Sequence, residues 1–101
     1  MSYPYYSFTV EPSTAKNKKL KVCIYKDGLK IKTLHVGSAK HYDYIKYYRD
    51  FPSIANERRL LYLSRHSKED KDFLKKSFWA DKLLWNKPTL QASIRSINLN
   101  R

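Results

Sequence analysis

Two runs of apolar and β-branched residues, 20–26 and 29–36, are separated by Asp27-Gly28. Asp-Gly between two such runs supplies the positive φ angles of a two-residue hairpin turn. The pattern therefore predicts a β-hairpin over this part of the chain.

A two-residue turn also predicts which residues face each other across the hairpin. The expected pairs are Lys26 with Leu29, Ile24 with Ile31, and Val22 with Thr33. One face of the hairpin is then expected to carry Leu20, Val22, Ile24, Ile31 and Thr33. The opposite face is expected to carry Lys19, Lys21, Lys30 and Lys32 around Cys23 and Tyr25. This alternation predicts one apolar face and one basic face.

The N-terminal arm, residues 1–19, contains one further strand signal. Tyr6, Phe8 and Val10 alternate with smaller or polar residues, which is typical of a short strand. We therefore expect an arm over 1–19 and a single small domain over 20–101, with or without a third strand contributed by the arm.

The remainder of the chain has helical signals with recognisable capping residues. The expected helices run from a Ser38 cap through the tyrosine cluster Tyr42 to Tyr48, from a Ser53 cap to His66, from a capping box at 67–70 to Trp85, and from Pro88 to Ile97. The fold class is α+β, with an N-terminal β-hairpin packed against three or four short helices.

The helix expected over 68–85 has apolar residues on every side. Leu74, Phe78 and Trp85 fall on one stripe, and the other sides carry Phe73, Trp79, Leu83 and Leu84. A helix that is apolar all round is buried all round. We expect Trp79 and Trp85 to be core or interface anchors, covered by another chain or by the final helix after a turn at Pro88.

The net charge of the chain is the feature of its composition that says most about its binding partners. The 101 residues include 21 Lys and Arg against nine Asp and Glu, a net charge of +12. Such an excess favours association with a polyanion or with an acidic protein surface. Aromatic residues make up 15% of the chain, so a folded core is expected.

Two clusters are candidate contacts for an anionic partner. The first is the hairpin face with Lys19, Lys21, Tyr25, Lys30 and Lys32, where the alternative role is protection of an exposed strand edge. The second follows helical spacing and contains Arg58, Arg59, Tyr62, Arg65 and His66. Arginine with tyrosine suits a nucleic-acid contact and a polar protein interface equally well.

Signals for catalysis are weak in this chain. Cys23 is the single cysteine, and with His35 and His41 it makes an incomplete zinc ligand set. The two glycines do not form a phosphate-binding loop. We expect no catalytic, metal or cofactor site, no small-molecule substrate and no membrane span.

Several stretches resemble a small family of uncharacterised proteins of nucleocytoplasmic large DNA viruses. They are 22–28 and 30–33 in the hairpin, Arg65-His66, and 83–90 with 92–94, of which Trp85-Asn86-Lys87-Pro88-Thr89-Leu90 is the most specific. The resemblance covers about 21–97. It implies a viral origin and no known activity, and it assigns no functional residue.

These observations lead to an expected function with two alternatives. The expectation is a non-enzymatic virion protein, a small basic minor capsid or cement component that bridges larger viral structural proteins. It would be made in the host cytoplasm or nucleus. The first alternative is a nucleic-acid-binding protein that coats or compacts the viral genome, and the second is a host-directed interaction factor.

Overall fold

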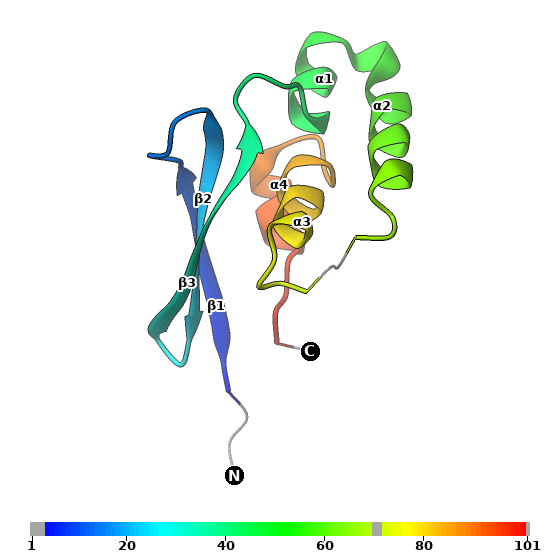
Figure 1. The fold of residues 1–101 in the computed structure, drawn as a ribbon. Helices are drawn as coiled ribbons and strands as arrows, with labels where there is room; N and C mark the ends of the chain where they lie inside the picture. Colours follow the sequence, from blue (N-terminus) through cyan, green and yellow to red (C-terminus); the bar gives the residue numbers. More distant parts are fainter. Residues whose placement is uncertain (1–3, 70–71, 101) are drawn as a thin grey trace.

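The N-terminal part of the molecule is an antiparallel sheet of three strands. The computed structural model describes residues 4–69 and 72–100. The strands β1(Tyr6–Pro12), β2(Lys18–Lys26) and β3(Leu29–Ser38) lie in the order β1-β2-β3 (Figure 1). Four α-helices follow, so the predicted α+β class and the third strand from the arm are both confirmed.

The turn between β2 and β3 has the predicted geometry. Asp27 and Gly28 have φ angles of 50° and 82°, and Lys26 lies opposite Leu29. Positive φ at both central residues matches the right-handed twist of the flanking strands. The hairpin prediction is confirmed at the turn.

Beyond the turn, the predicted register is wrong by one residue. An irregularity between Ile24 and Tyr25 places Ile24 opposite Lys32 and Val22 opposite Leu34. A β-bulge adds one residue to one strand, and a shift of one residue exchanges the faces of every later side chain. Ile31 is therefore 45% exposed, and Thr33 pairs with Cys23 on the face away from the core.

The bulge also divides the predicted basic face. Lys30 lies opposite Tyr25, whereas Lys32 lies opposite the buried Ile24. Side chains opposite each other in an antiparallel pair share a face of the sheet. Lys30 and Lys32 therefore do not lie on one face as predicted.

Two helices follow the sheet, and both begin differently from the prediction. Helix α1(Tyr44–Asp50) is capped by Asp43, whose side chain accepts a hydrogen bond from the Lys46 amide, and not by Ser38. Helix α2(Pro52–Arg65) has Pro52 in its first turn, so Ser53 lies inside the helix instead of capping it. Proline suits a first helical position because its missing amide hydrogen has no helical partner there.

The predicted helix over 68–85 is much shorter in the structure. Residues 72–75 form a turn, and the helical segment consists of α3(Lys76–Trp79) and a π-helical turn, η1(Ala80–Leu84). The Asp72 side chain accepts a hydrogen bond from the Leu74 amide, a local bond that competes with helix formation. Asp70 of the expected capping box lies outside the described residues.

The last helix, α4(Leu90–Ser96), starts at a Thr89 cap just after Pro88. Leu90 and Ile94 of this helix, and Ile97 directly after it, pack against the core cluster. This packing is as predicted for a final helix that folds back after Pro88. The chain therefore covers much of its own apolar C-terminal segment.

Helices α3 and α4 lie beside one face of the sheet, and α1 and α2 lie farther from the strands (Figure 1). The core joins strand residues to the C-terminal segment, and its members include Leu20, Val22, Ile24, Leu34, Val36, Trp79, Leu83, Leu84 and Trp85. Phe8 of β1 completes it from the arm, with its ring 4.9 Å from that of Trp79. In the described part of the chain, no helix has the length and apolar character needed to cross a bilayer.

Candidate binding groove

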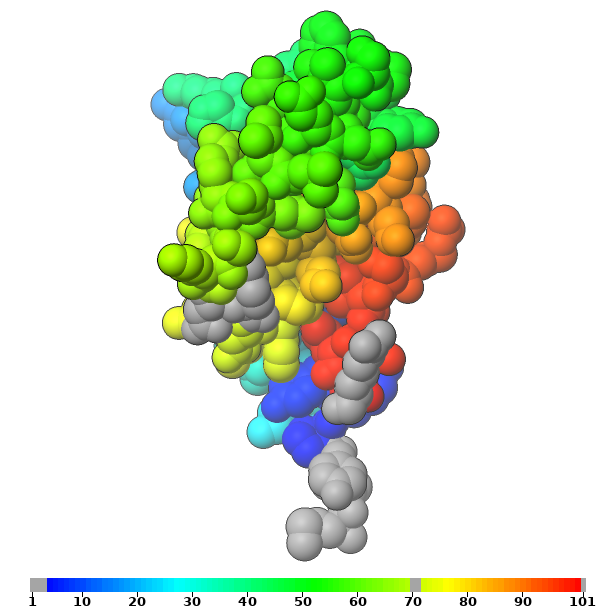
Figure 2. All heavy atoms as spheres, turned by 90° about the vertical axis from the view of Figure 1, so that its right-hand side faces the viewer, coloured from blue at the N-terminus to red at the C-terminus, as the bar shows by residue number. Residues whose placement is uncertain are grey.

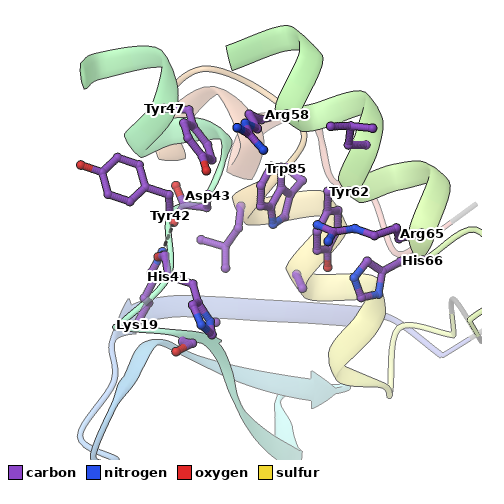
Figure 3. A pocket seen from close by; sticks show the side chains of 15 residues that line it. Lys19, His41, Tyr42, Asp43, Tyr47, Arg58, Tyr62, Arg65, His66 and Trp85 are labelled. Atoms are coloured by element: carbon purple, nitrogen blue, oxygen red, sulfur yellow. Dashed lines mark hydrogen bonds and ion pairs between the residues drawn. The ribbon is translucent and has the colours of Figure 1, made fainter. Parts of the chain in front are cut away.

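A groove of about 750 Å³ runs between α2 and the loop that joins β3 to α1 (Figure 3). Gly37, Ala80 and Leu84 are among the residues that line it and contribute small or apolar groups. Leu61 adds a further apolar side chain, and the remaining lining residues are aromatic, basic or polar: Lys19, Ser38, His41, Tyr42, Asp43, Tyr47, Arg58, Tyr62, Arg65, His66 and Trp85. Pockets that hold small ligands typically have volumes of about 300–1,000 Å³.

The groove exists because α2 is only partly packed against the rest of the molecule. Ala55 is its one buried residue, and Leu60 and Leu61 are 63% and 47% exposed. Arg58, Tyr62 and Arg65 follow helical spacing along the side that borders the groove. The structure thus brings three predicted contact residues together in one wall.

A column of stacked rings fixes α2 to the core. The ring of Tyr62 lies parallel to that of Trp85, with centroids 4.3 Å apart and an interplanar angle of 3°. His66 stacks on Tyr62 at 4.2 Å. Burial, together with the negative charges of Asp81 and Glu69, raises the pKa of Tyr62 above its ordinary value.

The opposite wall is built around a buried ion pair. The Nζ atom of Lys19 lies 2.5 Å from Oδ2 of Asp43 and donates a second hydrogen bond to the His41 carbonyl at 2.6 Å. The other Asp43 oxygen accepts the Lys46 amide that caps α1. Lys19 therefore neutralises Asp43 and joins β2 to α1, and it is not a free cation for a partner.

Arg58 and Arg65 are the exposed cations of the groove. The Arg58 guanidinium lies 5.9 Å from the centroid of the Tyr47 ring. Within the residues that the structure describes, neither arginine has a carboxylate at ion-pair distance. Both guanidinium groups can therefore receive an anion from solution.

The hairpin residues do not form a second site of this kind. Lys21 pairs with Glu11 at 3.0 Å, and this hydrogen-bonded carboxylate raises the pKa of Lys21. Tyr25 is half-buried, while Lys30 and Lys32 are exposed near the turn. Of the four lysines in the predicted basic cluster, Lys19 and Lys21 are thus paired with carboxylates, and Lys30 and Lys32 are exposed to solvent.

The other predicted residues hold the fold together. Arg59 donates from Nε to the Trp85 carbonyl at 2.8 Å. Trp79 is fully buried, and its Nε1 donates to the Phe73 carbonyl at 2.6 Å. Trp85 is 8% exposed, and half-buried Pro88 precedes the α4 cap. Trp79 and Trp85 are therefore buried anchors, as expected.

Cys23 is buried, with Sγ 3.9 Å from the Thr33 hydroxyl. Among residues 4–69 and 72–100, no three His, Cys, Asp or Glu side chains group as metal ligands do.

The groove contains residues that the sequence pattern did not single out. Asp43 and Leu61 line it beside the arginines. Asp43 had a usable signal, since an aspartate directly before a helix is a preferred cap. The Lys19–Asp43 pair had none, because it joins residues 24 positions apart across a strand and a loop.

No protein-family model, curated protein or solved structure matches this chain. A proposal about function therefore rests on the geometry of the molecule, and the resemblance to a viral family stays a prediction.

Proposed function

We propose that this protein is a non-enzymatic nucleic-acid-binding protein. One observation carries the proposal: two arginines that have no ion-pair partner among the described residues border a groove whose walls are rich in aromatic rings, in a chain with a net charge of +12. Arginines bind phosphate oxygens, and aromatic side chains stack on bases.

The distribution of charge supports this reading. Several acidic side chains are engaged locally, Glu11 by Lys21, Asp43 by Lys19, and Asp50 by Arg49. The hydrogen bond from Arg49 lowers the pKa of Asp50. Exposed cations lie along the whole chain and include Lys16, Lys18, Lys26, Lys30, Lys32, Lys40, Arg58, Arg65, Lys68, Lys75, Lys76, Lys82, Lys87 and Arg95. A polyanion would gain contacts over much of this surface.

The test is the salt dependence of binding to a labelled nucleic acid. Each neutralised phosphate contributes about −0.9 to the slope of log K against log salt on duplex DNA, so about four contacts predict a slope near −3.6. Anisotropy titrations from low to physiological salt measure this slope. Absence of binding at low salt, or an affinity independent of salt, would contradict the proposal.

A structural role in a virion is a second proposal. Exposed apolar side chains on α1, on α2 and between these helices favour it: Tyr48, Phe51, Leu60 and Leu61. Figure 2 shows these two helices covering much of one side of the molecule. Exposed apolar groups on neighbouring helices can contribute to a protein interface, as a minor capsid or cement protein would need.

Cross-linking mass spectrometry on purified, washed particles of the source virus would test this role. We expect cross-links from lysines near α1 and α2, such as Lys46, to a larger structural protein. A chain that is absent from such particles would exclude a virion role.

A further inference from the structure

The groove has features that a surface for duplex DNA does not need. It is a hollow with two walls, α2 on one side and the β3–α1 loop with Tyr47 on the other (Figure 3). A duplex presents its phosphates outward and keeps its bases stacked and paired inside. A binding site that only neutralises duplex phosphates needs a basic surface that follows the outside of the duplex, and it needs no hollow for a base.

Building on the nucleic-acid function above, we propose that the groove receives an unpaired base of a single strand, with flanking phosphates bound by Arg58 and Arg65. The two arginines are seven positions apart on α2, which separates them by about 10 Å along the helix axis. Leu61 and Tyr62 lie between them on the same wall. An extended strand that follows α2 can thus contact both arginines while the base between them turns inward.

The interior of the groove suits the flat, apolar faces of a base. Gly37, Ala80 and Leu84 supply small or apolar surface, and the Tyr47 ring, which also contacts Tyr42 and Arg58, borders the groove at one end. Base–aromatic stacking tolerates any base, because every base has a π face. Polar groups for its edge come from Ser38 and His41.

The electrostatics of the groove favour a phosphate-bearing ligand. Asp43, whose carboxylate lines the groove, is already neutralised by Lys19 and also accepts a hydrogen bond from the Lys46 amide of α1. Asp81, which interacts with Tyr62, lies in a separate hollow of about 480 Å³ beside Arg59. An entering phosphate therefore meets the arginines without an opposing free carboxylate from the Asp43 wall.

An acidic peptide is the competing occupant. Its carboxylates would pair with the two guanidinium groups. They would not stack on the aromatic side chains of the groove, unless the peptide also contained aromatic residues. The aromatic lining therefore favours a nucleotide base over a carboxylate side chain.

The experiment compares two labelled probes, a dT12 single strand and a hairpin duplex with the same number of phosphates. The full chain and two double variants are titrated by fluorescence anisotropy at low and physiological salt. Arg58→Gln with Arg65→Gln alters the groove, while Lys30→Gln with Lys32→Gln removes the same charge at the hairpin turn. All four positions are exposed, so both variants are expected to fold, which circular dichroism checks.

We expect the wild-type chain to bind dT12 at least about tenfold more tightly than the duplex, since one stacked base accounts for a preference of this size. The arginine variant should lose about tenfold on dT12 and much less on the duplex. The lysine variant should weaken both probes by similar, small factors.

The possible failures separate the two proposals. Equal affinity for both probes, with the two variants behaving alike, would overturn the groove inference and leave the nucleic-acid function intact. Failure to bind either probe would overturn both. Displacement of dT12 by oligoglutamate of equal charge, at equal or lower concentration, would reassign the groove to an acidic peptide.

Discussion

Gly28 and Gly37 show that the same backbone conformation can have different physical causes. Their φ angles are 82° and 81°, in the region that disfavours any residue with a Cβ atom. Gly28 lies at the tip of the hairpin, where an added Cβ would meet nothing within 4 Å. At Gly37 the same atom would lie 2.6 Å from Cδ1 of the buried Leu84. Gly37 therefore serves both the backbone and the close packing of β3 against η1.

Alanine substitutions separate these two effects. Gly28→Ala should lower the free energy of unfolding by about 1–2 kcal/mol, from backbone strain alone. Gly37→Ala should lower it by about 2–5 kcal/mol, because overpacking adds to the same strain. Urea unfolding of both variants measures the difference, and equal losses would show that Leu84 yields without cost.

At the scale of elements, Asp43 connects the sheet to the helices. One carboxylate oxygen caps α1 through the Lys46 amide, and the other binds Lys19 of β2. A buried charge is tolerable only with a partner, so each residue of the pair depends on the other. This junction sets the position of the loop that forms one wall of the groove.

The two roles of Asp43 can be measured apart. Asp43→Asn keeps a good cap but loses the ion pair, and we expect it to destabilise the chain by about 1–2 kcal/mol. Asp43→Ala loses the cap as well as the ion pair with Lys19, with an expected cost of about 2–4 kcal/mol. Thermal unfolding followed by circular dichroism compares the stabilities of the two variants. An asparagine variant as unstable as the alanine variant would mean that the cap contributes little.

For the whole molecule, stability depends on contacts between distant parts of the chain. Asn100 donates to the Tyr6 carbonyl at 2.6 Å and accepts the Tyr6 amide at 2.7 Å, across 94 positions of sequence. The Trp85 ring stacks on Tyr62 of α2, and the Trp85 carbonyl accepts a hydrogen bond from Nε of Arg59. The C-terminal segment thus holds both the first strand and the second helix in place.

Trp85 is the residue whose loss should affect the whole molecule most. Trp85→Ala should cost about 3–5 kcal/mol, comparable to the entire stability of a small domain, and should give an unfolded or insoluble chain. Trp85→Phe keeps an aromatic ring against Tyr62 and should remain folded. Far-ultraviolet circular dichroism with a thermal melt distinguishes them, and a folded, soluble alanine variant would instead mark Trp85 as an interface residue.

The sequence by itself determined the features that depend on neighbouring residues. Asp27-Gly28 specified the hairpin turn because its φ preferences act within two residues, and alternation at Tyr6, Phe8 and Val10 specified β1. The burial of Trp79 and Trp85 followed from an apolar pattern that no exposed helix can have.

Only the tertiary structure decided which side chains meet. The bulge beside Ile24 places Lys30 and Lys32 on different faces of the sheet. No local sequence pattern indicates that one strand of a β-pair contains an extra residue. The groove depends on how far α2 stands from the sheet, which is set by the Tyr62–Trp85 stack and the Lys19–Asp43 pair. Those contacts are selected by the packing of the complete core, because their partners are distant in sequence and adjacent only after folding.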